Sequence, residues 1–239
     1  MPDLDFVLIG GLAVLAGAIV QSSVGLGVGL VATPVITLLF PSLMPGAVLV
    51  PSAVLPLATL AREVRHADLR GLRWAFGGRL VGTPLGAWAV AAVPADAFGA
   101  LIGAVVLAAL VAGAWRGTVP RNPATLTTAG LVAGATGTAS GIGGPPIALL
   151  YQHESGPRVR ATLAVFFTVG ALLSLAVLAA AGQLPREQVL AGLTLVPCVL
   201  AGFVAAGSLR RRLDAGRTRI AVALVVGASA LSLIVRSVM

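Results

Sequence analysis

The longest uncharged segment of the chain runs from Phe6 to Ala61 and contains no Asp, Glu, Lys or Arg. About 20 apolar residues in a helix are enough to cross a bilayer, so this segment holds more than one membrane helix. Further uncharged segments lie at 80–95, 97–115, 122–153, 161–185, 188–209 and 220–235. Only 10% of the residues are charged, whereas soluble domains carry about 25%. The sequence predicts an all-α, polytopic integral membrane protein.

Charge and cysteine content exclude several other classes. The N-terminal residues MPDLDF carry two acids and no basic residue, so we expect the first helix to be retained rather than cleaved as a signal peptide. The single cysteine, Cys198, lies in an apolar segment and offers neither a disulfide framework nor a cysteine metal site. The net charge of +8 does not indicate nucleic acid, because the arginines lie between apolar segments rather than on one basic face.

The arginines predict the orientation of the chain in the membrane. They gather in four clusters, at 62–73, 116–121, 158–160 and 210–219. Short cytoplasmic loops concentrate basic residues, so we place these clusters inside. The Arg-poor breaks at 41–46, 93–97 and 182–188 then lie outside, together with both termini. We expect a multi-pass protein of a bacterial inner membrane.

This orientation gives five membrane elements in each half of the chain. In residues 1–118 they lie near 6–21, 28–40, 46–61, 72–92 and 97–115. In residues 119–239 they lie near 124–138, 144–152, 159–181, 188–209 and 218–237. Because five is odd, the second half enters from the opposite side. The prediction is therefore a bundle of two inverted five-element repeats.

A Gly-rich motif recurs in both halves. AGAIVQSSVGLG at 16–27 aligns with AGATGTASGIGG at 133–144, and with one residue skipped Gly25 pairs with Gly141. Corresponding loops carry opposite Arg content, as an inverted duplication requires: 62–73 is rich and 182–188 is poor. Inverted repeats are a transporter architecture, with the substrate site where the repeats meet.

The elements beside each motif are too short to cross the bilayer alone. They have roughly 10 to 16 residues, or about 15–24 Å, against a hydrocarbon core of about 30 Å. Irregular backbone at this depth persists only when it is buried in protein or lines a wet cavity. We predict broken or re-entrant helices at the paired Gly-rich motifs.

Helix starts at membrane depth favour anions, because they present unpaired N–H groups and the positive end of the helix dipole. The sequence places such starts after 27–29 and at Pro145 and Pro146, and neither motif contains an acid. A small oxyanion therefore suits the motifs better than a cation. The alternative is that their small residues only permit close helix packing. The candidate substrate-binding residues are Gln21, Ser22, Ser23, Gly25, Gly27, Gly29, Thr138, Ser140, Gly141, Gly143, Gly144 and Pro145.

Arg79 lies about seven residues into the fourth element, roughly 10 Å below the interface. An arginine in a membrane segment costs about 2.5–3.5 kcal/mol on insertion scales, so it pairs, snorkels or has a function. Two interpretations stay open: snorkelling to the cytoplasmic surface, or attracting an anion on the substrate path.

The sequence contains no catalytic or metal-binding constellation. It has no metal-ligand spacing, no Gly-Lys-Ser/Thr phosphate loop and no serine beside a membrane-embedded base. We expect that the chain is not an enzyme and binds no cofactor. It could be part of an ATP-driven pump only if another chain supplies the ATPase.

The motifs resemble those of the sulfite exporter TauE/SafE family of membrane permeases. The resemblance rests on GLGVGLVATPVI at 25–36, SGIGGPPIAL at 140–149, RVRATLAVFF at 158–167 and the basic loop RRRLDAGRTR before a last apolar helix. It spans nearly the whole chain and implies a secondary carrier of sulfite or organosulfonates. Carried over by motif, its site would use Ser23, Gly25, Gly27, Gly29, Ser140, Gly141, Gly143 and Gly144; Arg79 matches no pattern of the family.

The leading hypothesis is a secondary transporter that moves such an anion by alternating access, with H⁺ or Na⁺ as candidate coupling ions. A second is a channel or carrier for another small ion, including a cation bound through backbone carbonyls. A third is a non-transporting membrane subunit, although no loop exceeds about 12 residues and a docking element needs more.

Overall fold

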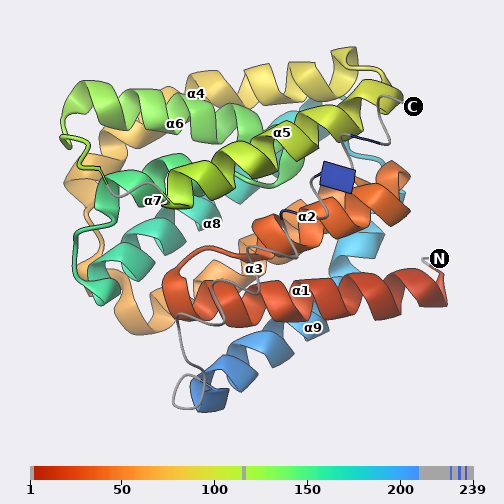
Figure 1. The fold of residues 1–239 in the computed structure, drawn as a ribbon, viewed down its shortest axis with the longest axis horizontal. Helices are drawn as coiled ribbons and strands as arrows, with labels where there is room; N and C mark the ends of the chain where they lie inside the picture. Colours follow the sequence, from red (N-terminus) through yellow and green to blue (C-terminus); the bar gives the residue numbers. More distant parts are fainter. Residues whose placement is uncertain (1–2, 115–116, 210–226, 228–230, 233–234, 236–239) are drawn as a thin grey trace.

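The structure is a computed structural model that describes residues 3–114, 117–209, 227, 231–232 and 235. Within these residues the chain is helical, and the predicted all-α fold is confirmed (Figure 1). The elements are α1 (Leu4–Val24), α2 (Val28–Leu39), the 3-10 turn η1 (Pro41–Leu43), α3 (Gly46–Glu63), the 3-10 turn η2 (Val64–His66), α4 (Leu69–Ala92), α5 (Ala95–Ala114), α6 (Pro123–Ser140), α7 (Pro145–Tyr151), α8 (Gly156–Ala180) and α9 (Arg186–Leu209).

Two sequence predictions fall largely outside this part of the chain. They are the basic loop at 210–219 and the last membrane element near 218–237. Among the described residues, four segments are long and apolar enough to cross a bilayer, by length and composition. These are Leu4–Ser22, Gly46–His66, Gly156–Ala180 and Arg186–Gly207. Leu4–Ser22 lies beside the first Gly-rich motif, so the prediction that this element is too short to cross the bilayer alone is wrong.

Both Gly-rich motifs break a helix in the same way. α1 ends at Gly25, with φ 94°, and α6 ends at Gly141, with φ 74°. This left-handed conformation is strained for residues with a Cβ and is typical of glycine after a helix. In each break the glycine N–H donates to a carbonyl four residues earlier, Gln21 O or Gly137 O. The next helices, α2 and α7, begin within a few residues.

The helices pack into two bundles, each with its own apolar core, and a third, smaller cluster of Leu49, Ala87 and Leu178 joins α3 to α4 and α8. The first core joins α1, α2, α3, α5 and α9, around residues such as Phe6, Ile36 and Leu195. The second joins α4, α6, α7 and α8, around Leu72, Ile147 and Phe166. α4 therefore packs with helices that follow it in the second half, and α9 packs with helices of the first half.

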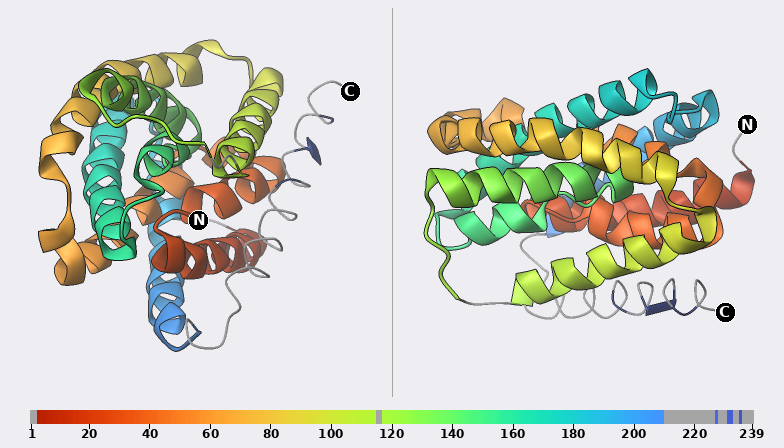
Figure 2. Two further views of the ribbon diagram at one scale, coloured as in Figure 1. Left: turned by 60° about the vertical axis from the view of Figure 1, so that its left-hand side comes forward. Right: turned by 90° about the horizontal axis from the view of Figure 1, so that it is seen from above.

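The closest packing between two helices is that of α4 on α6, which run side by side (Figures 1 and 2). Glycine makes it possible on both helices. A Cβ at Gly78 would overlap the carbonyl oxygen of Thr127, and one at Gly82 would overlap that of Leu131. A Cβ at Gly130 would likewise overlap the carbonyl oxygen of Ala75. Such small-residue stripes let membrane helices approach backbone to backbone.

Candidate functional site

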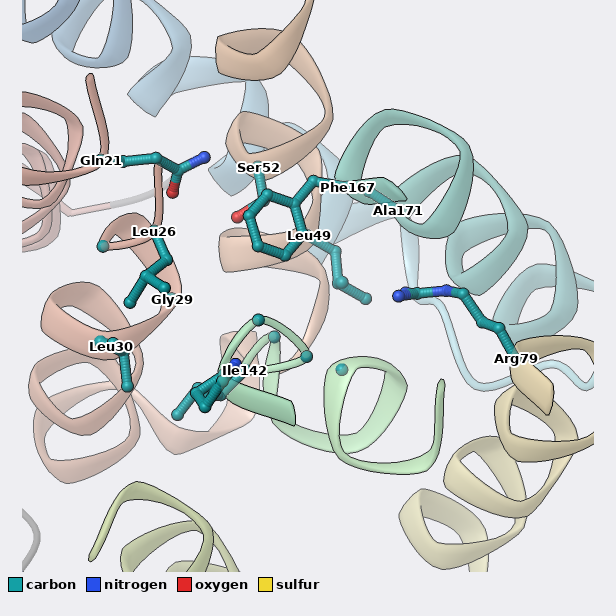
Figure 3. A pocket seen from close by; sticks show the side chains of 16 residues that line it. Gln21, Leu26, Gly29, Leu30, Leu49, Ser52, Arg79, Ile142, Phe167 and Ala171 are labelled. Atoms are coloured by element: carbon teal, nitrogen blue, oxygen red, sulfur yellow. The ribbon is translucent and has the colours of Figure 1, made fainter. Parts of the chain in front are cut away.

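A small cavity lies where the two broken helix pairs meet (Figure 3). Its lining comes from the α1–α2 break, the α6–α7 break and helices α3, α4 and α8. Its volume is about 40 Å³, while a single water needs roughly 10–15 Å³ by the same measure. The cavity has room for a few waters or one small ion.

The structure brings many of the predicted site residues to this cavity and leaves others away from it. The predicted residues that line it are Gln21, Gly27, Gly29, Gly141, Gly143, Gly144, Pro145 and Arg79. Ser22, Gly25, Thr138 and Ser140 do not line it. The side chain of Ser23 lies outside the described part of the structure.

The buried hydroxyls of the motifs bond within the protein instead of facing the cavity. Ser22 Oγ donates to Ala18 O at 2.7 Å, and Ser140 Oγ donates to Thr136 O at 2.7 Å. Thr138 Oγ1 lies 2.8 Å from Ser174 Oγ. In an apolar surrounding a helical hydroxyl satisfies itself on the nearest free acceptor, because an unpaired one costs free energy. In this structure these hydroxyls therefore bond to protein atoms and do not line the cavity, and their role in orienting substrate oxygens stays a prediction.

The two helix starts at the cavity offer an anion less than the sequence indicates, in free N–H groups at α2 and in helix dipole at α7. Gln21 Oε1 accepts a hydrogen bond from Val28 N–H at 3.0 Å, so the side chain of Gln21 caps the start of α2. α7 has only seven residues, so few peptide dipoles add up along it. An anion in this cavity needs another source of positive charge.

Several glycines of the two motifs line the cavity and also pack closely. A Cβ at Gly29 would overlap Gly141 O, so the two breaks touch each other at these residues. A Cβ at Gly143 would lie 2.6 Å from Ala133 O, and one at Gly144 2.8 Å from Phe167 Cζ. These glycines therefore permit close packing of the helices, as the alternative interpretation of the motifs states. Because they have no side chains, they also leave the cavity open between them.

Arg79 is buried, with 3% of its surface exposed, so the snorkelling interpretation is wrong. Its guanidinium points from α4 toward the cavity (Figure 3). Nη2 donates to Ser174 Oγ at 3.4 Å, while Nε and Nη1 find no hydrogen-bond partner among the described residues. No described carboxylate forms an ion pair with it. Leaving a buried donor unpaired costs about 1–3 kcal/mol, and more for a charged group.

Sequence reasoning missed the walls that α3 and α8 contribute, as well as apolar neighbours within the motifs. The missed lining residues are Leu26, Leu30, Leu49, Ser52, Gly137, Ile142, Phe167 and Ala171. Ser52 matters most among them, because its buried Oγ has no hydrogen-bond partner among the described residues. From the sequence alone, a single serine in an apolar helix that lines a cavity cannot be distinguished from one that packs between helices.

A family model described as Sulfite exporter TauE/SafE matches residues 9–233 of the chain. The matched segment includes both helix breaks and every residue that lines the cavity. No curated protein and no solved structure matches the chain.

Proposed function

We propose that this chain, which belongs to the sulfite exporter TauE/SafE family, is a secondary transporter that carries sulfite or a small organosulfonate through the cavity by alternating access. Membership makes it a multi-pass membrane protein of a transporter family. The observation that carries the finer proposal is the cavity between two broken helix pairs, with a buried arginine in its wall that has no ion-pair partner among the described residues. We place the protein in a bacterial inner membrane, with its Arg-rich loops inside and both termini outside.

The packing of helices supports the proposal that 1–118 and 119–239 are inverted repeats. In that correspondence α1 is equivalent to α6, and α4 to α9. α4 packs against α6, and α9 packs against α1, so each half lends its fourth helix to the first helix of the other half. α3 and α8, which are also equivalent, pack against each other. A site at the centre of such an arrangement can be opened from either side by small movements of the two bundles.

At one end of α3, charged and polar side chains join the two halves. Arg160 donates to Glu63 through Nη2 at 2.8 Å and through Nε at 3.0 Å. Tyr151 OH donates to Asp68 Oδ2 at 2.9 Å, and Arg158 lies 3.7 Å from the same oxygen. We assign this end to the cytoplasmic side.

At the other end of α3, one glutamine joins the two halves. Gln188 is 6% exposed and donates through Nε2 to Ser42 O at 3.0 Å and to Met44 O at 2.6 Å. Its Oε1 accepts from Gly46 N–H at 3.1 Å. The two halves thus contact each other at both ends of α3. These contacts support the proposal that the cavity is closed on both sides in this conformation and can open at either end.

Flux measurements on the purified protein in proteoliposomes test the proposed function. Sulfite, methanesulfonate, sulfate and chloride are presented in turn, with and without a pH or Na⁺ gradient, and empty liposomes serve as the control. We expect saturable flux of sulfite or methanesulfonate, and a response to one gradient would identify the coupling ion. Saturable flux of chloride or Na⁺ alone would favour a carrier of another ion. Folded protein without any flux would contradict transport and favour a subunit role.

Asp68 makes the stability of the cytoplasmic end depend on pH. Its carboxylate caps α4 by accepting from Gly71 N–H at 3.1 Å. Burial raises the pKa of Asp68, but the hydrogen bonds from Gly71 and Tyr151 and the charges of Arg158 and Arg121 outweigh it, so the pKa lies below the ordinary 3.8. Because the folded pKa is the lower one, the stabilisation is complete above about pH 4 and is lost as the pH falls through the folded value.

We therefore expect Asp68→Asn to lower the thermal unfolding midpoint in detergent at pH 7, and the difference from wild type to shrink below pH 3.8. Asn is as good an N-cap as Asp, so the change keeps the cap while it removes the charge and the oxygen that accepts from Tyr151 OH. A difference that stays constant between pH 7 and pH 3 would contradict this assignment.

A further inference from the structure

Two polar groups in the cavity wall have buried atoms without a hydrogen-bond partner among the described residues. They are the guanidinium of Arg79 on α4 and the hydroxyl of Ser52 on α3. The hydroxyls of Ser22, Thr138 and Ser140 near the breaks have partners. The hydroxyls of Thr37, Thr83 and Thr168 also lack one among the described residues, but these side chains do not line the cavity. Buried polar groups are paired in the great majority of cases, and an unpaired one points to an absent ligand, ion or water. Here both groups line the same small cavity.

The surroundings of Arg79 hold its guanidinium in place and leave its charge uncompensated. Its Cζ lies 4.7 Å from the centre of the Phe166 ring, and Ser174 Oγ accepts from Nη2. Gly170 on α8 makes room for it, because a Cβ there would overlap the guanidinium. These contacts fix the position of the group but neutralise nothing, since none of them carries a negative charge.

The rest of the cavity wall selects for a small ligand. Leu26, Leu30, Leu49, Ile142 and Phe167 give it an apolar lining, so few other groups can donate to a ligand. A compact oxyanion with two or more oxygens can accept from the guanidinium of Arg79 and from the hydroxyl of Ser52, while an apolar substituent contacts the leucines. Charge-assisted hydrogen bonds of this kind are roughly twice as strong as neutral ones.

We propose that Arg79 and Ser52 bind the oxyanion group of the transported substrate, and that Arg79 sets the requirement for a negative charge. This inference rests on the proposed function and adds which residues bind and what they select. A neutral molecule of the same shape is rejected, because it leaves the guanidinium buried and uncompensated.

Equilibrium binding to the purified, detergent-solubilised protein tests the assignment, with sulfite, methanesulfonate and the neutral isostere dimethyl sulfone as probes. The variants are Arg79→Gln, Arg79→Lys and Ser52→Ala. The matched control is Arg73→Gln, which removes an exposed arginine from the same helix. Ser52 has no partner to lose among the described residues, so Ser52→Ala is expected to fold even if a change at Arg79 does not.

We expect wild type to bind the anions and not dimethyl sulfone. Arg79→Gln should weaken anion binding about 100-fold, and Arg79→Lys, which keeps the charge but not the fork of donors, about 10-fold. Ser52→Ala should weaken it about 10-fold, and Arg73→Gln less than about twofold. If wild type transports the anions and both Arg79→Gln and Ser52→Ala bind them with undiminished affinity, this inference is overturned while the proposed function stands. A wild type that neither binds nor transports a sulfur anion would overturn the proposed function as well.

Discussion

Gly78→Ala is expected to lower the yield of folded protein and its unfolding midpoint strongly, whereas Gly77→Ala on the same helix is expected to fold at least as well as wild type. A Cβ at Gly78 would overlap the backbone carbonyl of Thr127, which cannot rotate away as a side chain can. α4 and α6 would have to separate along their shared length. Overpacking costs about 1–3 kcal/mol in ordinary cores, and more where backbone must move, against a total stability of about 5–15 kcal/mol.

Gly77 is the matched control because it differs only in the direction that it faces. It is exposed, and an added Cβ meets nothing within 4 Å in the part of the chain that the structure describes. Replacing glycine by alanine in a helix also removes a penalty of about 0.8–1.0 kcal/mol. The measurements are the yield of monodisperse protein on size exclusion and the thermal unfolding midpoint. Equal yields and midpoints for the two variants would show that α4 does not pack on α6 through Gly78.

Much of the helical architecture could be predicted from the sequence, because its causes are local. Uncharged segments and arginine clusters mark where helices run and where they end. Breaks at the two Gly-rich motifs could be predicted for the same reason, because glycines gather there within apolar segments. The structure places the breaks at Gly25 and Gly141, which both adopt the left-handed conformation. The division into inverted repeats rests on pattern and pairing and stays a prediction.

The site could be predicted only in part, because its walls come from helices far apart in the sequence. Ser52 and Phe167 reach the cavity through the packing of α3 and α8 around the breaks, which no local pattern encodes. The partners of Ser22 and Ser140 are backbone carbonyls of their own helices, and the motif letters do not show whether a hydroxyl faces these or a ligand. Arg79 is the clearest case: its depth is readable from the sequence, but whether it snorkels depends on the space that Gly170 leaves on another helix.

Gly170→Ala is expected to reduce anion affinity and transport about 10- to 100-fold, by displacing the guanidinium of Arg79 while the fold stays intact. The added Cβ would overlap the guanidinium carbon, but the overlapped atoms are the far end of a flexible side chain that can turn away. The expected cost in stability is therefore small, on the order of 1 kcal/mol, unlike that of Gly78→Ala. The measurements are methanesulfonate binding, sulfite flux and the unfolding midpoint, with Gly207→Ala as the control, since a Cβ there meets no atom of the described residues within 4 Å.

The double variant decides whether Gly170 acts through Arg79. If the only effect of Gly170→Ala is to move the guanidinium, then adding it to Arg79→Gln should cause little further loss, because the group that it displaces is already gone. Residues in contact show such non-additivity, whereas independent sites add. Losses that multiply in the double variant would mean that Gly170 affects the cavity by another route, and an unchanged affinity in Gly170→Ala alone would mean that the position of Arg79 does not matter for the anion.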